Sequence, residues 1–381
     1  MTIPAVAAAD PAPFDPIGDL LGRIRAEFAS NRPGEVADYI PQLATVDPAA
    51  FGLALAGVSG SVYEAGDTDV PFTIQSVSKP FVYALALALA DVGMDEVLAR
   101  VGVEPSGEAF NAISLEPGTG RPDNPLINAG AILISSLVTG ADPEERSARI
   151  LVLLSRCAGR DLVVDDAVFR SEHDNGDRNR ALAHLMRASG SLTMPVDEAV
   201  DVYFRQCSVL VTAADLAVMG ATLANGGVNS RTSVVAMEQA VAEQVLTVMA
   251  TCGMYDFSGE WLFRVGLPAK SGVSGGLVAV SPSQFGIGMF SPPLDERGNS
   301  VPGGRGRPGH FRAVLAPSDA PGHPQWSLVR PGGTRRVRAT DRSVAGRGRR
   351  RCRRGPGPLH AGVHRVRHGR AGAADRATPP R

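Results

Sequence analysis

The chain has 381 residues, of which 44% are hydrophobic and 20% charged, so one large domain or two smaller ones can bury a sizeable core. The formal net charge of −1 balances two unlike parts. Residues 1–300 hold 19 basic and 36 acidic residues, whereas residues 301–381 hold 19 arginines and three aspartates. An acidic body followed by a basic tail excludes one evenly mixed globule.

The sequence shows no sign of export or of a membrane span. The N-terminus lacks the positive start and uninterrupted apolar core of a secretory signal, and no apolar stretch is long enough to cross a membrane. The four cysteines lie far apart, without the paired spacing of a disulfide or zinc framework. We therefore expect a cytoplasmic protein with reduced thiols and no structural zinc.

The N-terminal elements mix helices and strands. Residues 18–29 have helical spacing, and residues 51–66 predict a hairpin that turns at Ser59–Gly60. A short strand over 72–75 then leads into a helix over 76–93. Further on, Asn124 and Pro125 predict the cap and first residue of a helix over 125–138, because Pro at the first position has no hydrogen bond to lose.

The middle of the chain is helical, and strands return at the end. The predicted helices cover 143–158, 165–172, 179–190, 195–208, 212–227 and 235–252, and the predicted strands cover 262–272, 276–282 and 285–292. Strands at both ends of the chain favour an α/β fold with one mixed sheet built from both ends and an inserted helical subdomain. We predict a domain over 1–300, with the sheet built from about 30–75 and 260–292 and a helical subdomain over about 80–250.

The segment Ser76-Val77-Ser78-Lys79 is an S-x-x-K motif. Positions three apart share one face of a helix, so the Ser76 hydroxyl and the Lys79 amine can meet there. A lysine in a water-poor pocket loses its proton more easily and can activate a serine without histidine. A Ser-His-Asp site is poorly supplied, since the body contains only His173 and His184. By itself the motif is also typical of an ordinary helix cap followed by a surface lysine.

Lysine usage strengthens this interpretation. The chain has two lysines, Lys79 and Lys270, against 36 arginines, so a retained lysine favours a site where arginine cannot substitute. Lys270-Ser271-Gly272 ends a predicted strand, and such a strand beside an S-x-x-K helix resembles the penicillin-recognising serine enzymes. A second cation there lowers the pKa of the first lysine.

A wider set of segments resembles the serine-dependent glutaminases, relatives of the β-lactamases. These segments run in the family's order over about residues 18–300: ADYIPQLA, IQSVSKPF, NPLINAGAI, SE with N-x-RN, YFRQCS, TCGMYDFSGEW and AKSGVSGG. The resemblance implies a β-lactamase/transpeptidase-like fold, in which an antiparallel sheet is flanked by helices and an all-helical subdomain is inserted. It implies hydrolysis of L-glutamine to L-glutamate and ammonia, without a metal or organic cofactor. It also implies a homodimer or homotetramer.

The resemblance assigns residues by position. Ser76 would be the nucleophile, Lys79 the base or proton relay, and Tyr255 the catalytic tyrosine, with Lys270 in support. The implied substrate contacts are Tyr39, Ser76, Asn128, Glu172, Asn179, Tyr203, Tyr255 and Val273. Glu172 suits an α-ammonium, and the amides and Tyr203 suit an α-carboxylate. The backbone N–H groups of Ser76 and Val273 would form the oxyanion hole. From composition alone, Tyr203 would be core and Asn179 a solvated turn.

Two other functions stay open at this stage. The first is a β-lactamase or peptidase of the same architecture, which the expected cytoplasmic location disfavours. The second is a non-catalytic body with a nucleic-acid-binding tail over 301–381, disfavoured because this arginine-rich segment offers few aromatic rings for base stacking. The sequence of this segment is rich in Arg, Gly, Pro and Ala and has no periodicity, which predicts disorder or an out-of-frame translation.

Overall fold

A computed structural model describes residues 15–300 with gaps at 30–33, 39, 89–91 and 109–111. The chain divides into two units, Met1–Leu328 and Val329–Arg381, and all described residues belong to the first. The predicted contact Tyr39 and the tail over 301–381 lie outside the described residues. Within the described part, no helix is long and apolar enough to cross a membrane.

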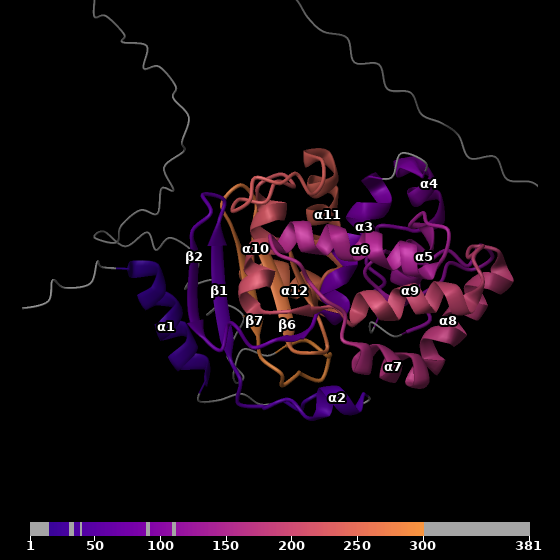
Figure 1. Cartoon of the computed structure of the whole chain (residues 1–381). Coiled ribbons are helices and arrows are strands. Elements are labelled where there is room, and N and C mark those ends of the chain that lie inside the picture. Colours follow the sequence, from indigo (N-terminus) through magenta and orange to yellow (C-terminus); the bar gives the residue numbers. More distant parts are fainter. Residues whose placement is uncertain (1–14, 30–33, 39, 89–91, 109–111, 301–381) are drawn as a thin grey trace, which may run out of the picture. The chain divides into compact units, whose positions relative to one another are not determined.

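The sheet has five antiparallel strands in the order β2-β1-β7-β6-β5 (Figure 1). Their bounds are β1 Gly52–Gly57, β2 Val62–Gly66, β5 Ala269–Ser271, β6 Gly276–Ser281 and β7 Phe285–Phe290. The β1–β2 hairpin turns where the sequence predicts it, and β1 then pairs with β7, more than 200 residues further on. This pairing confirms one antiparallel sheet built from both ends of the sequence.

Alternation along the strands separates two covered faces. Leu53, Ile287 and Met289 belong to a buried cluster with side chains of α1 (Pro16–Ala29) and α12 (Ser258–Val265). Ala54 and Ala56, one residue out of phase, pack against α10 (Ala213–Ala224). Because successive strand side chains point to opposite faces, this pattern places α1 and α12 on one face and α10 on the other.

Glycines in β7 allow α10 to approach the sheet closely. A Cβ atom added at Gly286 would collide with backbone atoms of Ala217 and Ala221, and one at Gly288 with backbone atoms of Ala213 and Ala217. Backbone atoms cannot move aside as a flexible side chain can, so only glycine fits at these two strand positions. The α10 helix therefore lies directly on the sheet, although the sequence groups it with the helical middle of the chain.

Eight other described helices contribute to the largest buried cluster or pack against it, and this cluster includes side chains of α10. They are α3 (Lys79–Ala88), α4 (Gly93–Arg100), α5 (Asn128–Leu137), α6 (Pro143–Ala158), α7 (Asp166–Asn175), α8 (Asp177–Ser189), α9 (Val196–Cys207) and α11 (Gln239–Cys252). The α10 helix thus contacts both the sheet and this helical group (Figure 1).

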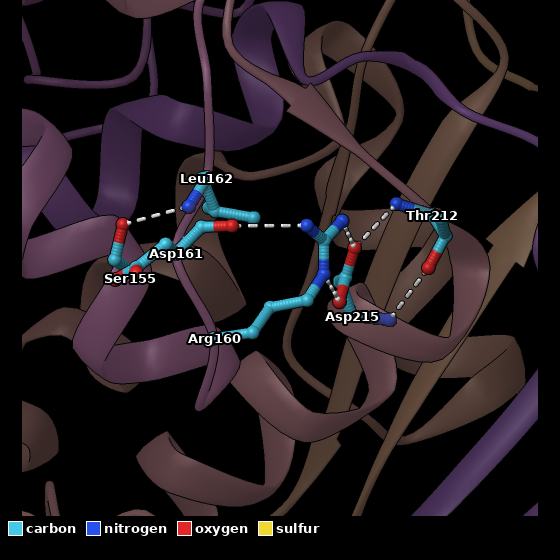
Figure 2. Close-up of polar contacts among 6 residues, drawn as sticks. All are labelled: Ser155, Arg160, Asp161, Leu162, Thr212 and Asp215. Atoms are coloured by element: carbon cyan, nitrogen blue, oxygen red, sulfur yellow. Dashed lines mark hydrogen bonds and ion pairs between the residues drawn. The ribbon is translucent and has the colours of Figure 1, made fainter.

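A bidentate ion pair links α10 to the end of α6 (Figure 2). The Arg160 guanidinium donates to both carboxylate oxygens of Asp215, at 2.8 and 2.6 Å. Asp215 also closes a capping box with Thr212 at the start of α10. The same carboxylate therefore accepts the Thr212 N–H at the helix start and fixes α10 against the residue that follows α6.

Three sequence predictions need correction. The strand predicted over 262–272 is instead helix α12 followed by the short strand β5. Gly266 ends that helix in the left-handed conformation (φ 81°), and Trp261 and Val265 supply its buried side, so helical spacing outweighs the local β propensity. The helix predicted from Pro125 begins at Asn128, because the Asn124 side chain accepts from the N–H groups of a preceding turn.

The third correction concerns the short strand predicted over 72–75. It shortens to β3 (Phe72–Thr73) and pairs with β4 (Leu210–Val211) in a separate two-stranded sheet. Because β4 directly follows α9, this pairing brings the start of the S-x-x-K segment beside the end of α9.

Candidate active site

The S-x-x-K segment forms a tight turn at the start of α3. Gln75–Ser78 is a 3-10 helix (η1), and the Lys79 N–H donates to the Ser76 carbonyl. Ser76 lies in this 3-10 helix and Lys79 is the first residue of α3, so the two side chains are three residues apart on one continuous helical segment and can share one face. Gln75 has φ 47°, a left-handed conformation that costs energy for a residue other than glycine. Such strain just before a candidate nucleophile is typical of functional sites.

The Lys79 amine is fully enclosed, with only 1% of the residue exposed. Its Nζ donates a 2.7 Å hydrogen bond to Oδ1 of Asn128 on α5. Burial lowers the pKa of Lys79 to about 8, although negative charge on Cys207 and Glu172 would act in the opposite direction. A substantial fraction of Lys79 can therefore be neutral near physiological pH and can accept a proton.

Asn128 is the centre of a small polar network. Its Nδ2 donates to Oδ1 of Asn179 at 3.0 Å, and the Tyr203 hydroxyl donates to its Oδ1 at 3.3 Å. These residues come from the starts of α5 and α8 and from the middle of α9. Tyr203 is buried, as composition predicts, yet its hydroxyl is part of the network. Composition favours a solvated loop at Asn179, but the structure places this residue in the first helical turn of α8 and within the network.

Tyr255 is a second group in contact with Ser76. Its hydroxyl donates to the Ser271 carbonyl at 3.1 Å and forms a second hydrogen bond with the Ser76 side chain. Burial raises the pKa of Tyr255, and the Ser76 hydrogen bond partly offsets this effect. Tyr255 also has a left-handed backbone (φ 58°). A protonated phenol held against a serine can pass a proton between groups, but it does not carry a resting negative charge.

Lys270 supports this tyrosine. Its Nζ donates to the Ser271 carbonyl at 2.7 Å and lies 4.1 Å from the centre of the Tyr255 ring. Burial, followed by the charge of Lys79, lowers the pKa of Lys270. The Lys-Ser-Gly motif thus places a second amine close enough to Lys79 for the charge of Lys79 to lower the pKa of Lys270. The reverse effect, of Lys270 on the pKa of Lys79, stays a prediction.

The strand end that follows Lys270 lies against the serine turn. A Cβ atom added at Gly272 would lie 3.1 Å from the Ile74 carbonyl oxygen and 3.2 Å from a methyl group of Val77. Val273, the next residue, is 6% exposed. Among the turns and loops that the structure describes, neither the Val273 N–H nor the Ser76 N–H donates to a backbone carbonyl. Both groups are therefore suited to bind an oxyanion.

Glu172 lies near the C-terminal end of α7 and is 6% exposed. Burial raises the pKa of its carboxyl to about 7, while a hydrogen bond with Gln75 and the charge of Lys79 act to lower it. Gln75 is not among the site residues predicted from the sequence. Its position next to Ser76 could have indicated a role in the site, but only the folded chain shows its contact with Glu172.

All predicted site residues within the described part of the chain gather around the serine turn. They are Ser76, Lys79, Asn128, Glu172, Asn179, Tyr203, Tyr255, Lys270 and Val273, and they come from η1, α3, α5, α7, α8, α9, η2 (Tyr255–Phe257), β5 and the loop after β5. His173 is half exposed on α7 and has no contact with this network among the described residues. The arrangement supplies a serine, a buried amine that can accept its proton, and two backbone N–H groups suited to bind an oxyanion, which together can carry out acyl transfer.

The sheet with helices on both faces and the buried S-x-x-K turn beside a Lys-Ser-Gly strand place the protein in the serine-β-lactamase-like fold class. Within that class, the family model described as glutaminase matches residues 34–306. The chain belongs to the glutaminase family.

Curated relatives and solved structures agree with this assignment. A glutaminase of Clavibacter michiganensis subsp. michiganensis is 54% identical over 304 residues, which cover 80% of this chain and 92% of the relative. A glutaminase of Trichormus variabilis is 52% identical over 288 residues, 76% of this chain and 86% of the relative. The structure of the probable glutaminase ybaS has a TM-score of 0.74 at 42% identity and covers 79% of this chain and 96% of its own.

The structure of Mglu in its glutamate form is also similar. It has a TM-score of 0.73 at 50% identity and covers 76% of this chain and 67% of its own.

Proposed function

We propose that this protein hydrolyses L-glutamine to L-glutamate and ammonia through an acyl-enzyme on Ser76. The observation that carries the proposal is the buried Lys79 amine three residues after Ser76 on one helical segment, in a chain of the glutaminase family. The glutamate form of the similar protein Mglu agrees with a site for this product.

The reaction divides into two balanced steps. The Ser76 oxygen attacks the side-chain carboxamide carbon, while its proton passes to neutral Lys79 or, through Tyr255, toward the same lysine. The tetrahedral oxyanion is bound by the N–H groups of Ser76 and Val273. The C–N bond then breaks, the nitrogen takes the proton and leaves as ammonia, and a γ-glutamyl ester remains. Water then attacks the ester carbonyl and gives a proton to Lys79, the C–O bond to Ser76 breaks, the Ser76 oxygen takes that proton, and glutamate leaves.

Polar side chains around the serine turn suit the two charged ends of a free amino acid. Glu172 would pair with the α-ammonium group, and Asn128, Asn179 and Tyr203 would donate to the α-carboxylate. Tyr39 stays a predicted pocket residue outside the described part of the chain. We also retain as predictions a catalytic domain over 1–300, a cytoplasmic homodimer or homotetramer, no cofactor, and no nucleic-acid partner.

A comparison of substrates tests the proposal and its nearest rival. We expect the purified chain to release ammonia from L-glutamine and to leave a penicillin unhydrolysed at the same enzyme concentration. Rapid acid quenching during turnover should trap a γ-glutamyl ester on the peptide that contains Ser76, detectable by mass spectrometry. Faster hydrolysis of the penicillin than of glutamine would replace this proposal with a β-lactamase.

Substrate binding should depend on the ionisation of Glu172. Its pKa of about 7 in the free protein lies above the ordinary value, and an α-ammonium partner favours the ionised form. Binding therefore strengthens as pH rises toward 7 and levels off above it. As pH rises toward 7, we expect KM for glutamine to fall by about tenfold for each pH unit, because each unit below 7 changes the ionised fraction of Glu172 about tenfold.

The matched variant is Glu172→Gln, which removes the ionisation and keeps the shape. Its KM should be raised and should stay flat between pH 5.5 and 7 if Glu172 causes the slope, a window set by about 1.5 units below that pKa. An equal slope in the variant would assign the pH dependence to another group.

A further inference from the structure

A chain of buried hydrogen bonds runs beneath the serine turn and ends on its backbone. The Ser135 hydroxyl lies within hydrogen-bond distance of two acceptors, the Ala131 carbonyl at 2.7 Å and Oε1 of Gln206 at 2.9 Å. Nε2 of Gln206 donates to the Ser78 hydroxyl at 3.2 Å, and the Ser78 hydroxyl in turn donates to the Gln75 carbonyl at 2.7 Å. The Gln206 and Ser78 donors point the same way, so the first of these two bonds polarises and strengthens the second.

Three elements that carry candidate site residues are joined by this chain. Ser135 lies on α5, two turns after Asn128, and Gln206 lies on α9, one turn after Tyr203. Ser78 lies between Ser76 and Lys79 in the sequence. Gln206 is 2% exposed and the two serines are fully buried. A buried amide costs free energy unless both its ends are bonded, and here both ends are, to two different elements.

The last acceptor is the carbonyl of one particular peptide group. The Gln75 carbonyl and the Ser76 N–H belong to the same planar peptide unit. Fixing that carbonyl therefore fixes the direction of the N–H that the proposed mechanism uses for the oxyanion. The peptide follows a residue with φ 47°, a conformation that persists only where the surroundings hold it. The Ser78 hydroxyl and Gln206 supply such a hold from the buried side.

We propose that Gln206 is a positioning residue that acts through Ser78 on the Gln75–Ser76 peptide and so orients the Ser76 N–H toward the developing oxyanion. The inference deepens the proposed function and rests on it. An oxyanion donor interacts most strongly with the charge that develops in the transition state. Loss of the hold should therefore lower kcat and leave KM nearly unchanged.

Two single variants and their combination test this role by steady-state kinetics with glutamine. Removing an oxyanion donor outright lowers kcat by about 100- to 1000-fold, so misdirecting one should cost less. We expect Ser78→Ala to lower kcat by about 10- to 100-fold and Gln206→Leu by about 10-fold, each with KM within about twofold. If Gln206 acts only through Ser78, the double variant should be no slower than Ser78→Ala alone.

Ser208→Ala is the matched control. Ser208 is also fully buried at the end of α9, two residues from Gln206, but its hydroxyl donates to the Phe204 carbonyl in its own helix. We expect this control to keep its kcat within about twofold, even where its loss of thermal stability matches that of Gln206→Leu. If Gln206→Leu fails to fold, Ser78→Ala carries the test, because it removes one hydroxyl and adds no bulk.

Three results would overturn the inference. They are an equal loss of kcat in Ser208→Ala, a rise in KM that matches the loss of kcat/KM, and full multiplication of the two single effects in the double variant. Failure of the inference is separable from failure of the proposed function. An inactive Ser76→Ala protein beside a fully active Ser78→Ala protein removes only the inference, whereas an active Ser76→Ala protein removes the proposed acyl-enzyme on Ser76 as well.

Discussion

Replacing Ser76 by alanine should lower kcat for ammonia release from glutamine by at least about a thousandfold, because removal of a covalent nucleophile costs that much or more in other serine hydrolases. The substitution removes one oxygen from a residue that is 6% exposed, and the hydroxyl of Tyr255 loses its Ser76 partner but keeps the Ser271 carbonyl. The fold should therefore survive. Direct binding of glutamine, measured by calorimetry, should persist in the inactive variant.

Ser208→Ala again supplies the control, since it removes a buried hydroxyl that has no contact with the described polar network. The γ-glutamyl ester seen by mass spectrometry should disappear from Ser76→Ala. Substantial glutamine hydrolysis by that variant would exclude Ser76 as the nucleophile and remove the acyl-enzyme from the proposed mechanism.

Replacing Lys79 by arginine should have an effect of similar size. Arginine keeps the positive charge but cannot release its proton near neutral pH, so the proton acceptor beside Ser76 is lost. We expect kcat to fall by at least about a hundredfold, the low end of what general-base catalysis contributes, and by more if the longer side chain displaces Asn128. Because Lys79 has a pKa of about 8, kcat of the unaltered protein should rise with pH up to about 8.

Lys79→Met separates loss of the base from loss of the fold. Burial lowers the pKa of Lys79 in the folded protein, so the charged lysine destabilises the folded state below about pH 8. This destabilisation shrinks as pH rises from about 8 toward 10.5. The methionine variant should be inactive, yet more resistant to thermal unfolding than the unaltered chain at pH 7. This advantage should shrink toward pH 10. A Lys79→Arg protein with full activity would contradict the role of Lys79 as base.

Local patterns determine much of this protein. The S-x-x-K and Lys-Ser-Gly motifs, the scarcity of lysine, the hairpin at residues 51–66 and the helix over 143–158 are visible in the sequence, because each depends on neighbours along the chain. The fold class and the glutaminase family follow from these patterns and the collinear segments. The secondary structure predicted over 262–272 is wrong, because the helix and the strand there each have too few residues to establish a hydrophobic period.

Contacts between distant segments decide the rest. Asn128 and Lys79 are 49 positions apart, and Gln206 and Ser78 are 128 apart, so no spacing rule could pair them. The pKa values of Lys79 and Glu172 shift because helices from across the chain exclude water around them. Sequence thus determined which chemical groups are present and their local order. Only tertiary packing set their distances, burial and orientation, because those depend on segments that meet after the chain has folded.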